Sequence, residues 1–142
     1  MVEAVRFAGG WLFDQAMAGW EVWVLTTDHT DARPLWILGA RAVDLECALR
    51  FPLRDPRPEA YAVHADLYRS DARIRRMVLD ALDDGTAEVR LWGDQTAASV
   101  RHRLSAAARA FKTQALEAAA ASADPYEVTE TFGGPSITDG PL

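Results

Sequence analysis

Short apolar runs alternate with helix-like segments along most of this chain. The runs span residues 2–8, 21–27, 40–45, 61–67 and 87–92, and each has Gly or Asp at or just after its end. A repeated strand, turn and helix is typical of a parallel sheet covered by helices on both faces. Residues 19–28 are apolar on both sides of the pleat, as in a central parallel strand. The pattern predicts an α/β fold: one doubly wound, mostly parallel sheet of about five strands.

The segments between the runs predict the helices and one loop. Helical spacing of apolar residues indicates helices at 11–18, 31–39, 44–50, from Ser70 or Asp71 to Gly85, and 94–122. Three prolines make residues 51–58 a loop. Residues 31–39 have a second interpretation, a strand at 35–38, but the helix keeps the alternating order intact. With that helix, residues 19–45 resemble, at the level of fold, the second and third strands of a Rossmann-like domain and their crossover helix.

Length and charge predict one domain followed by an acidic tail. A chain of 142 residues, 49% hydrophobic and 25% charged, has room for a single core. Four of the 21 acidic residues lie in 124–142, which has three Pro, three Gly and no basic residue. We therefore expect a Rossmann-like α/β domain over 1–123 and a disordered or extended tail over 124–142.

Composition also indicates a compartment. No apolar run approaches the roughly 20 residues that span a bilayer, and the N-terminus lacks the pattern of a secretory signal. Cys47 is the single cysteine, which suits a reducing cytoplasm, and Lys112 is the one lysine among 15 basic residues, a bias typical of a GC-rich bacterial genome. We expect a cytoplasmic bacterial protein with no membrane contact.

The strongest candidate binding residues lie at the predicted strand ends. Gly9 and Gly10 open a predicted helix, where backbone N–H groups bind phosphate, and Asp28 ends the next strand near the spacing of a ribose-binding acid. The full G-x-G-x-x-G pattern is absent, and a tight turn explains the glycines equally simply. Asp66 and Asp94 join Asp28 as acids at carboxyl ends of strands, although helix capping accounts for such positions too.

Other chemistry has little support, so we assign no catalytic residue and no metal ligand. Cys47 lies in apolar sequence, which raises a thiol pKa, and His29 has no distant partner residues that complete a metal site. Arginines are concentrated in residues 50–76, but acids are interleaved with them, which favours surface ion pairs over a nucleic-acid site.

These observations favour a non-catalytic binding or regulatory module that interacts with a protein partner. The alternative is a nucleotide- or dinucleotide-binding domain, or a small enzyme, with its site at Gly9, Gly10, Asp28, Asp66 and Asp94. The sequence leaves the cofactor open.

The predicted last helix also suggests self-association. Residues 97–122 would measure about 39 Å at roughly 1.5 Å per residue, longer than the sheet requires. Its apolar face would overhang, with Lys112 solvated on the opposite side. A two-fold copy commonly buries such a stripe, so we expect a homodimer with Phe111 and Leu116 at the contact; a tail folded back over the stripe is the alternative.

Overall fold

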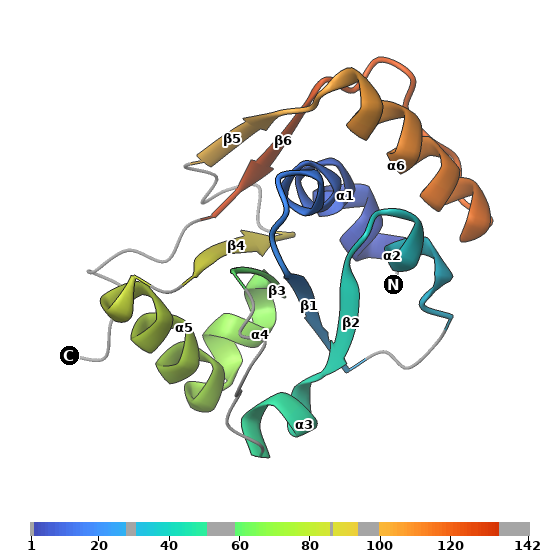
Figure 1. The fold of residues 1–142 in the computed structure, drawn as a ribbon. Helices are drawn as coiled ribbons and strands as arrows, with labels where there is room; N and C mark the ends of the chain where they lie inside the picture. The colour runs from blue at the N-terminus through green and yellow to red at the C-terminus, as the bar shows by residue number, and fades with distance from the viewer. Residues whose placement is uncertain (1, 28–30, 51–58, 86, 94–99, 134–142) are drawn as a thin grey trace.

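A computed structural model describes residues 2–27, 31–50, 59–85, 87–93 and 100–133 (Figure 1). Helices and strands alternate along the chain in the order α1 (Val2–Met17), β1 (Val22–Thr26), α2 (Arg33–Ile37), β2 (Arg41–Asp44), α3 (Leu45–Arg50), β3 (Ala60–His64), α4 (Ala65–Ser70), α5 (Ala72–Asp84), β4 (Glu88–Trp92), β5 (Val100–Arg103), α6 (Ala106–Ala118) and β6 (Thr129–Phe132).

Four strands form a parallel sheet in the order β2-β1-β3-β4. In register, Val24 of β1 lies beside Ala42 of β2 and Ala62 of β3. The prediction of an α/β fold with a parallel sheet is confirmed, and four of the five predicted strands are present. A second sheet, β5-β6, is antiparallel and separate, which the prediction of a single sheet did not include.

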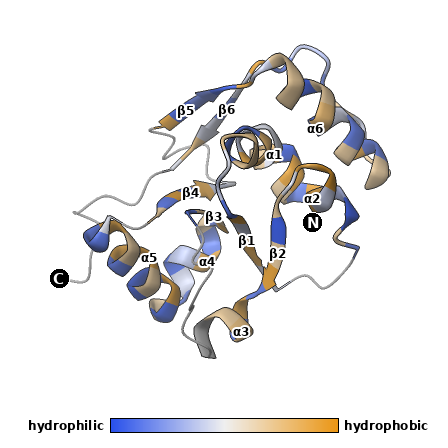
Figure 2. Cartoon of the chain, in the orientation of Figure 1, coloured by the Kyte–Doolittle hydropathy of each residue, from blue (hydrophilic) through white to orange (hydrophobic). Residues whose placement is uncertain are grey.

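Each face of the parallel sheet packs against its own set of helices. Alternate residues of β1 face opposite sides, so Val24 packs with the core of α1, α2 and α6, while Leu25 packs with α3, α4 and α5. Figure 1 shows these two helical layers on either side of the strands. In Figure 2, α5 has a hydrophobic stripe beside hydrophilic positions, and the stripe includes the fully buried Ile74 and Val78. Both faces of the sheet are therefore covered.

The predicted first strand is wrong, because residues 2–8 belong to α1. The buried side chains of this segment are Ala4, Val5, Ala8 and Leu12, which recur at helical spacing, while Glu3 is exposed. The glycine pair that suggested a turn lies in the middle of the helix. The sheet therefore starts with β1, and α1 precedes it.

The predicted long helix at 94–122 is also wrong. Residues 94–99 lie outside the described residues, and residues 100–103 form β5 rather than helix. Helix α6 begins after Ser105, whose Oγ accepts a hydrogen bond from the Ala108 N–H at 3.0 Å, and it ends at Ala118. At 13 residues it is half the expected length, so the argument that it overhangs the sheet does not hold.

Residues 124–133 form part of the folded structure. Strand β6 pairs with β5 in an antiparallel register, and Gly133 forms an isolated bridge to Leu91 at the end of β4. Phe132 is fully buried and its ring lies 5.8 Å from that of Trp11. An extended conformation was one of the two expected for this segment, and residues 129–132 are extended as β6, with Glu130 and Phe132 buried while Tyr126 and Val128 are exposed. The domain boundary at residue 123 stays a prediction.

Candidate functional site

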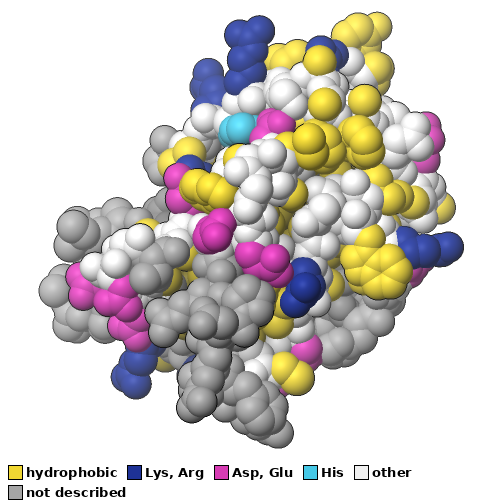
Figure 3. Space-filling model, in the orientation of Figure 1, with side chains coloured by type: hydrophobic (Ala, Val, Ile, Leu, Met, Phe, Trp, Pro, Cys, Tyr) yellow, Lys and Arg dark blue, Asp and Glu magenta, His cyan; other side chains and the backbone are white. Residues whose placement is uncertain are grey.

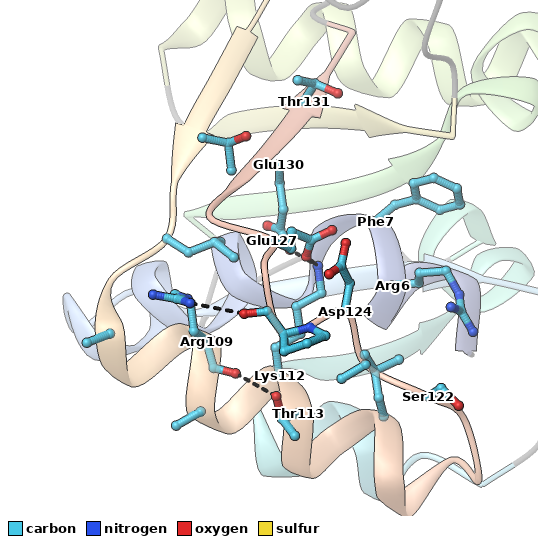
Figure 4. A pocket seen from close by; sticks show the side chains of 17 residues that line it. Arg6, Phe7, Arg109, Lys112, Thr113, Ser122, Asp124, Glu127, Glu130 and Thr131 are labelled. Atoms are coloured by element: carbon cyan, nitrogen blue, oxygen red, sulfur yellow. Dashed lines mark hydrogen bonds and ion pairs between the residues drawn. The ribbon is translucent and has the colours of Figure 1, made fainter.

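A pocket of about 770 Å³ opens between α1, α6 and residues 122–131 (Figure 4). Arg6 and Phe7 contribute to it from α1, Arg109 and Thr113 from α6, and Asp124 from the segment after that helix. This volume lies within the range of about 300–1,000 Å³ that is common for small-molecule sites. The pocket lies on the α1–α6 side of the molecule rather than at the predicted strand-end residues.

Lys112 reaches the pocket from the buried face of α6. Ala108, Lys112 and Leu116 follow one another at helical spacing and are all buried. The aliphatic stem of Lys112 lies against α1, where a Cβ built on Gly9 would be 3.3 Å from the Lys112 Cγ. The Lys112 side chain is only 6% exposed, and its ammonium lies 2.7 Å from Glu130 Oε2 and also pairs with Glu127. The prediction that Lys112 is solvated is therefore wrong.

Glu130 is the most deeply buried charged side chain of this group, at 1% exposure. Its Oε2 accepts from the Gly10 N–H at 2.8 Å, and its Oε1 accepts from the Trp11 N–H at 2.7 Å. Burial raises the pKa of the Glu130 carboxyl, and the Lys112 ammonium and the two N–H donors oppose that rise. Both carboxylate oxygens are occupied, so Glu130 joins α1, α6 and β6.

The pocket rim carries charges of both signs. Arg6, Arg109 and Asp124 are exposed, and Glu127 is half-buried at 31%. An Arg109 guanidinium N–H donates to the Pro125 carbonyl at 3.2 Å, and the other guanidinium donors have no partner among the described residues. Three cationic and three acidic side chains line the pocket, so its formal charge is balanced.

A serine, a histidine and an aspartate meet nearby, but not as a nucleophile and base. Asp14 lies between the other two: its Oδ1 accepts from Ser105 Oγ at 2.6 Å, and its Oδ2 lies 2.8 Å from His102 Nε2. The serine hydroxyl already caps α6. Nucleophilic catalysis needs the base hydrogen-bonded to the nucleophile itself. This cluster therefore anchors β5 and α6 to α1.

The structure does not place Gly9 and Gly10 at a phosphate-binding turn. Both are buried in the middle of α1. A Cβ on Gly10 would lie 1.9 Å from Leu104 Cδ2, far inside van der Waals contact. The glycines are present because β5 and α6 approach α1 closely there, and their proposed role in phosphate binding is corrected accordingly.

Of the three predicted acids, the structure describes only Asp66. Its side chain is 78% exposed in the first turn of α4 and pairs with Arg69 at 3.3 Å. The cap of α4 is His64, whose Nδ1 accepts from the Asp66 N–H at 3.0 Å. Asp28 and Asp94 lie outside the described residues. Of the predicted site, the structure therefore places Gly9 and Gly10 inside α1 and Asp66 in the first turn of α4.

Sequence reasoning missed Lys112, Glu127 and Glu130 as a group. One signal was present: Lys112 lies four residues from both Ala108 and Leu116, in register with a small and apolar helix face. Glu130 lies on β6, and its partner strand β5 lies 26 or more positions earlier in the sequence. No local pattern therefore marks Glu130 as buried.

Neither a metal site nor a membrane span is found in the described part of the chain. No group of three or more His, Cys, Asp or Glu side chains there is arranged to hold a metal ion. None of the described helices combines the length and the apolar character needed to cross a bilayer. Comparison with protein-family models, curated proteins and solved structures gave no match.

Proposed function

We propose that this protein is a non-catalytic binding module that takes a small polar ligand into the pocket between α1 and α6. One observation carries the proposal: a cavity of about 770 Å³ has a buried Lys112–Glu130 ion pair in its wall and charged side chains at its rim. A few polar groups in a concave site fix the orientation of a ligand.

Binding is favoured over catalysis because the buried polar groups are already engaged. Glu130 accepts three hydrogen bonds, from Lys112, Gly10 and Trp11, so it has no free oxygen with which to take a proton from a substrate. Lys112 pairs with two carboxylates and is a poor nucleophile in its charged form. Such a network supports a fixed binding surface.

A thermal-shift screen tests this proposal. The screen covers nucleotides, dinucleotides, sugars, amino acids, short peptides and divalent ions. A ligand at a hundredfold excess over its Kd stabilises the folded state by about 2.7 kcal/mol. We expect a stabilising ligand whose effect weakens in Arg109→Gln, a rim substitution, and persists in Arg76→Gln, an exposed change on α5. Stabilisation unaffected by either substitution would place the ligand elsewhere.

A second candidate function is a nucleotide or dinucleotide site, or a small enzyme, at the carboxyl ends of the strands. The strand order β2-β1-β3-β4 supports it. The chain passes from β1 to β2 on one side of β1 and then to β3 on the other side of β1, so the direction of the strand order reverses there. Ligands of open parallel sheets bind at such a switch point, and a Rossmann-like relationship would be consistent with it. His64 ends β3 and its ring lies 4.5 Å from that of Trp92. Stabilisation by NAD(P) or a nucleotide that is lost in Asp28→Ala would favour this function.

A cytoplasmic setting, a bacterial source, a protein partner and a homodimer remain proposals. The homodimer draws support from Phe111, which is 43% exposed while its ring stacks on that of Phe13 at 4.6 Å. Figure 3 shows exposed hydrophobic side chains gathered on the side of the molecule where α1, α2 and α6 lie. Leu116 gives no support, because it is buried at 2% exposure and cannot lie at a contact surface.

A further inference from the structure

We propose that the pocket between α1 and α6 takes a short peptide with a free amino end and a free carboxyl end. This inference rests on the proposed binding function and specifies its ligand. It follows from three features of the pocket wall: where the carboxylates gather, where the guanidinium groups lie, and which buried donor keeps a spare proton.

The centre of the pocket favours an ammonium group. Figure 4 shows the carboxylates of Asp124, Glu127 and Glu130 turned toward the single ammonium of Lys112. Glu130 is fully engaged, but Asp124 uses Oδ1 for the Tyr126 N–H at 2.9 Å, and Glu127 uses Oε1 for Lys112. The other oxygen of each has no hydrogen-bond partner among the described residues. A free amino end of a ligand can donate hydrogen bonds to this pair of oxygens.

The walls of the pocket favour a carboxylate. Arg109 and Arg6 lie on opposite sides of the acidic centre in Figure 4. Arg109 donates once, to the Pro125 carbonyl, and Arg6 has no hydrogen-bond or ion-pair partner among the described residues. A guanidinium group has five N–H donors in a fixed fork that matches a carboxylate. A ligand whose amino end lies at the centre can therefore place its carboxyl end against a wall.

Within the acidic centre, Lys112 supplies a buried donor. An ammonium group has three N–H donors, and Glu127 and Glu130 accept two of them. Only 6% of the Lys112 side chain is exposed, yet it lines the pocket. An uncharged acceptor such as a peptide carbonyl can take the third donor without adding charge. Such a carbonyl lies between the two charged ends of a short peptide.

The charge balance favours a ligand that carries both signs. Arg6, Arg109 and Lys112 are matched by Asp124, Glu127 and Glu130, so a bare anion or a bare amine would leave one charge without a partner beside a partly buried network. A zwitterion preserves the balance. The volume of about 770 Å³ lies within the range of about 300–1,000 Å³ of small-molecule sites, so it has room for a short peptide.

The test compares free dipeptides with the same dipeptides blocked at one end. The full chain is titrated by calorimetry with Ala-Ala, Ala-Phe, Lys-Ala and Asp-Ala, and with their N-acetyl and C-amide forms. We expect at least one free dipeptide to bind, and its affinity to fall at least tenfold when either end is blocked. Arg109→Gln and Asp124→Asn should each weaken binding of that dipeptide about tenfold, whereas the exposed α5 variants Arg76→Gln and Asp83→Asn should leave it unchanged.

Three outcomes would overturn the inference, and they differ in what they say about function. If a blocked form binds as well as the free dipeptide, the ligand is not recognised as a zwitterion, and the binding function stands. If another class of compound in the thermal-shift screen binds at this pocket and no dipeptide does, the proposal of a peptide ligand is wrong and the binding function again stands. If no compound of any class binds, both proposals fail.

Discussion

The carboxylate of Glu130 accepts the backbone N–H of Gly10 at 2.8 Å, joining the last described strand to the middle of the first helix across 120 positions of sequence. In a regular helix that N–H group donates to the carbonyl four residues earlier. The Trp11 N–H donates to the other oxygen of the same carboxylate at 2.7 Å, so two consecutive backbone groups of α1 bind Glu130. Helix α1, helix α6 and strand β6 are therefore held by one side chain.

Removing the Glu130 carboxylate should destabilise the fold strongly. Glu130→Ala leaves the buried Lys112 ammonium with one partner and two N–H groups without theirs, and breaking a buried ion pair costs roughly 3–5 kcal/mol. We expect a loss of about that size in the free energy of unfolding, measured by urea denaturation. Glu117→Gln, an exposed change on α6, should alter it by less than about 0.5 kcal/mol. Equal effects of the two variants would contradict this role.

Gly10→Ala should destabilise despite the better helix propensity of alanine. A Cβ at this position meets Leu104 Cδ2 at 1.9 Å, and overpacking a core costs about 1–3 kcal/mol. The gain from propensity is only about 1 kcal/mol. Combining Gly10→Ala with Leu104→Ala should cost less than the sum of the single changes, since the second removes the clash. Strict additivity in a double-mutant cycle would show that Leu104 does not cause the effect.

The stability of the protein should fall as pH rises through the raised pKa of Glu130. Because burial raises this pKa in the folded state, the folded protein binds a proton that the unfolded chain releases near pH 4.5, the ordinary value for this carboxyl. The contribution is therefore fully present below that pH and is lost above the folded pKa, with a slope of at most about 1.4 kcal/mol per pH unit. Urea denaturation of wild type and Glu130→Gln across pH 4–8 measures the difference. A difference between the two that rises with pH would have the wrong sign.

Asp71→Ala should weaken α5. The Asp71 Oδ1 accepts from the Arg73 N–H at 2.9 Å and caps the helix, and its pKa is lowered, chiefly by hydrogen bonding to the Arg73 side chain. Loss of an N-cap costs roughly 0.5–2 kcal/mol. Thermal denaturation followed by circular dichroism should report a lower Tm. Asp83→Ala near the other end of the helix provides the comparison, and an equal decrease there would remove the capping explanation.

We expect the proposed homodimer to depend on Phe111. Sedimentation equilibrium at micromolar concentration should give a mass near twice 15.6 kDa, the mass of one chain. Phe111→Ser should shift this equilibrium toward the monomer, whereas Leu82→Ser, which changes an exposed leucine on α5, should not. A wild-type mass of one chain would end the proposal of self-association.

The sequence by itself determined the central part of the fold, because those elements are specified locally. Asp71, one of the two predicted N-caps, caps helix α5, and Gly85 is its C-cap as predicted, since a side-chain cap and a left-handed glycine (φ 65°) need only neighbouring residues. Strands β1, β2 and β4 lie where short apolar runs end at Gly or Asp. Helix α2 is the helix predicted over 31–39, with Pro34 in its first turn.

Only the tertiary structure decided the two ends of the chain and the pocket that they form. Gly9 and Gly10 indicate a turn to any local argument, but both lie inside α1. Leu104 and Lys112 approach the helix so closely there that little room is left for a side chain. Residues 100–103 form a strand because β6 pairs with them. Lys112 is buried because Glu130 neutralises it. Each of these outcomes depends on a contact between residues far apart in sequence, which no local pattern can specify.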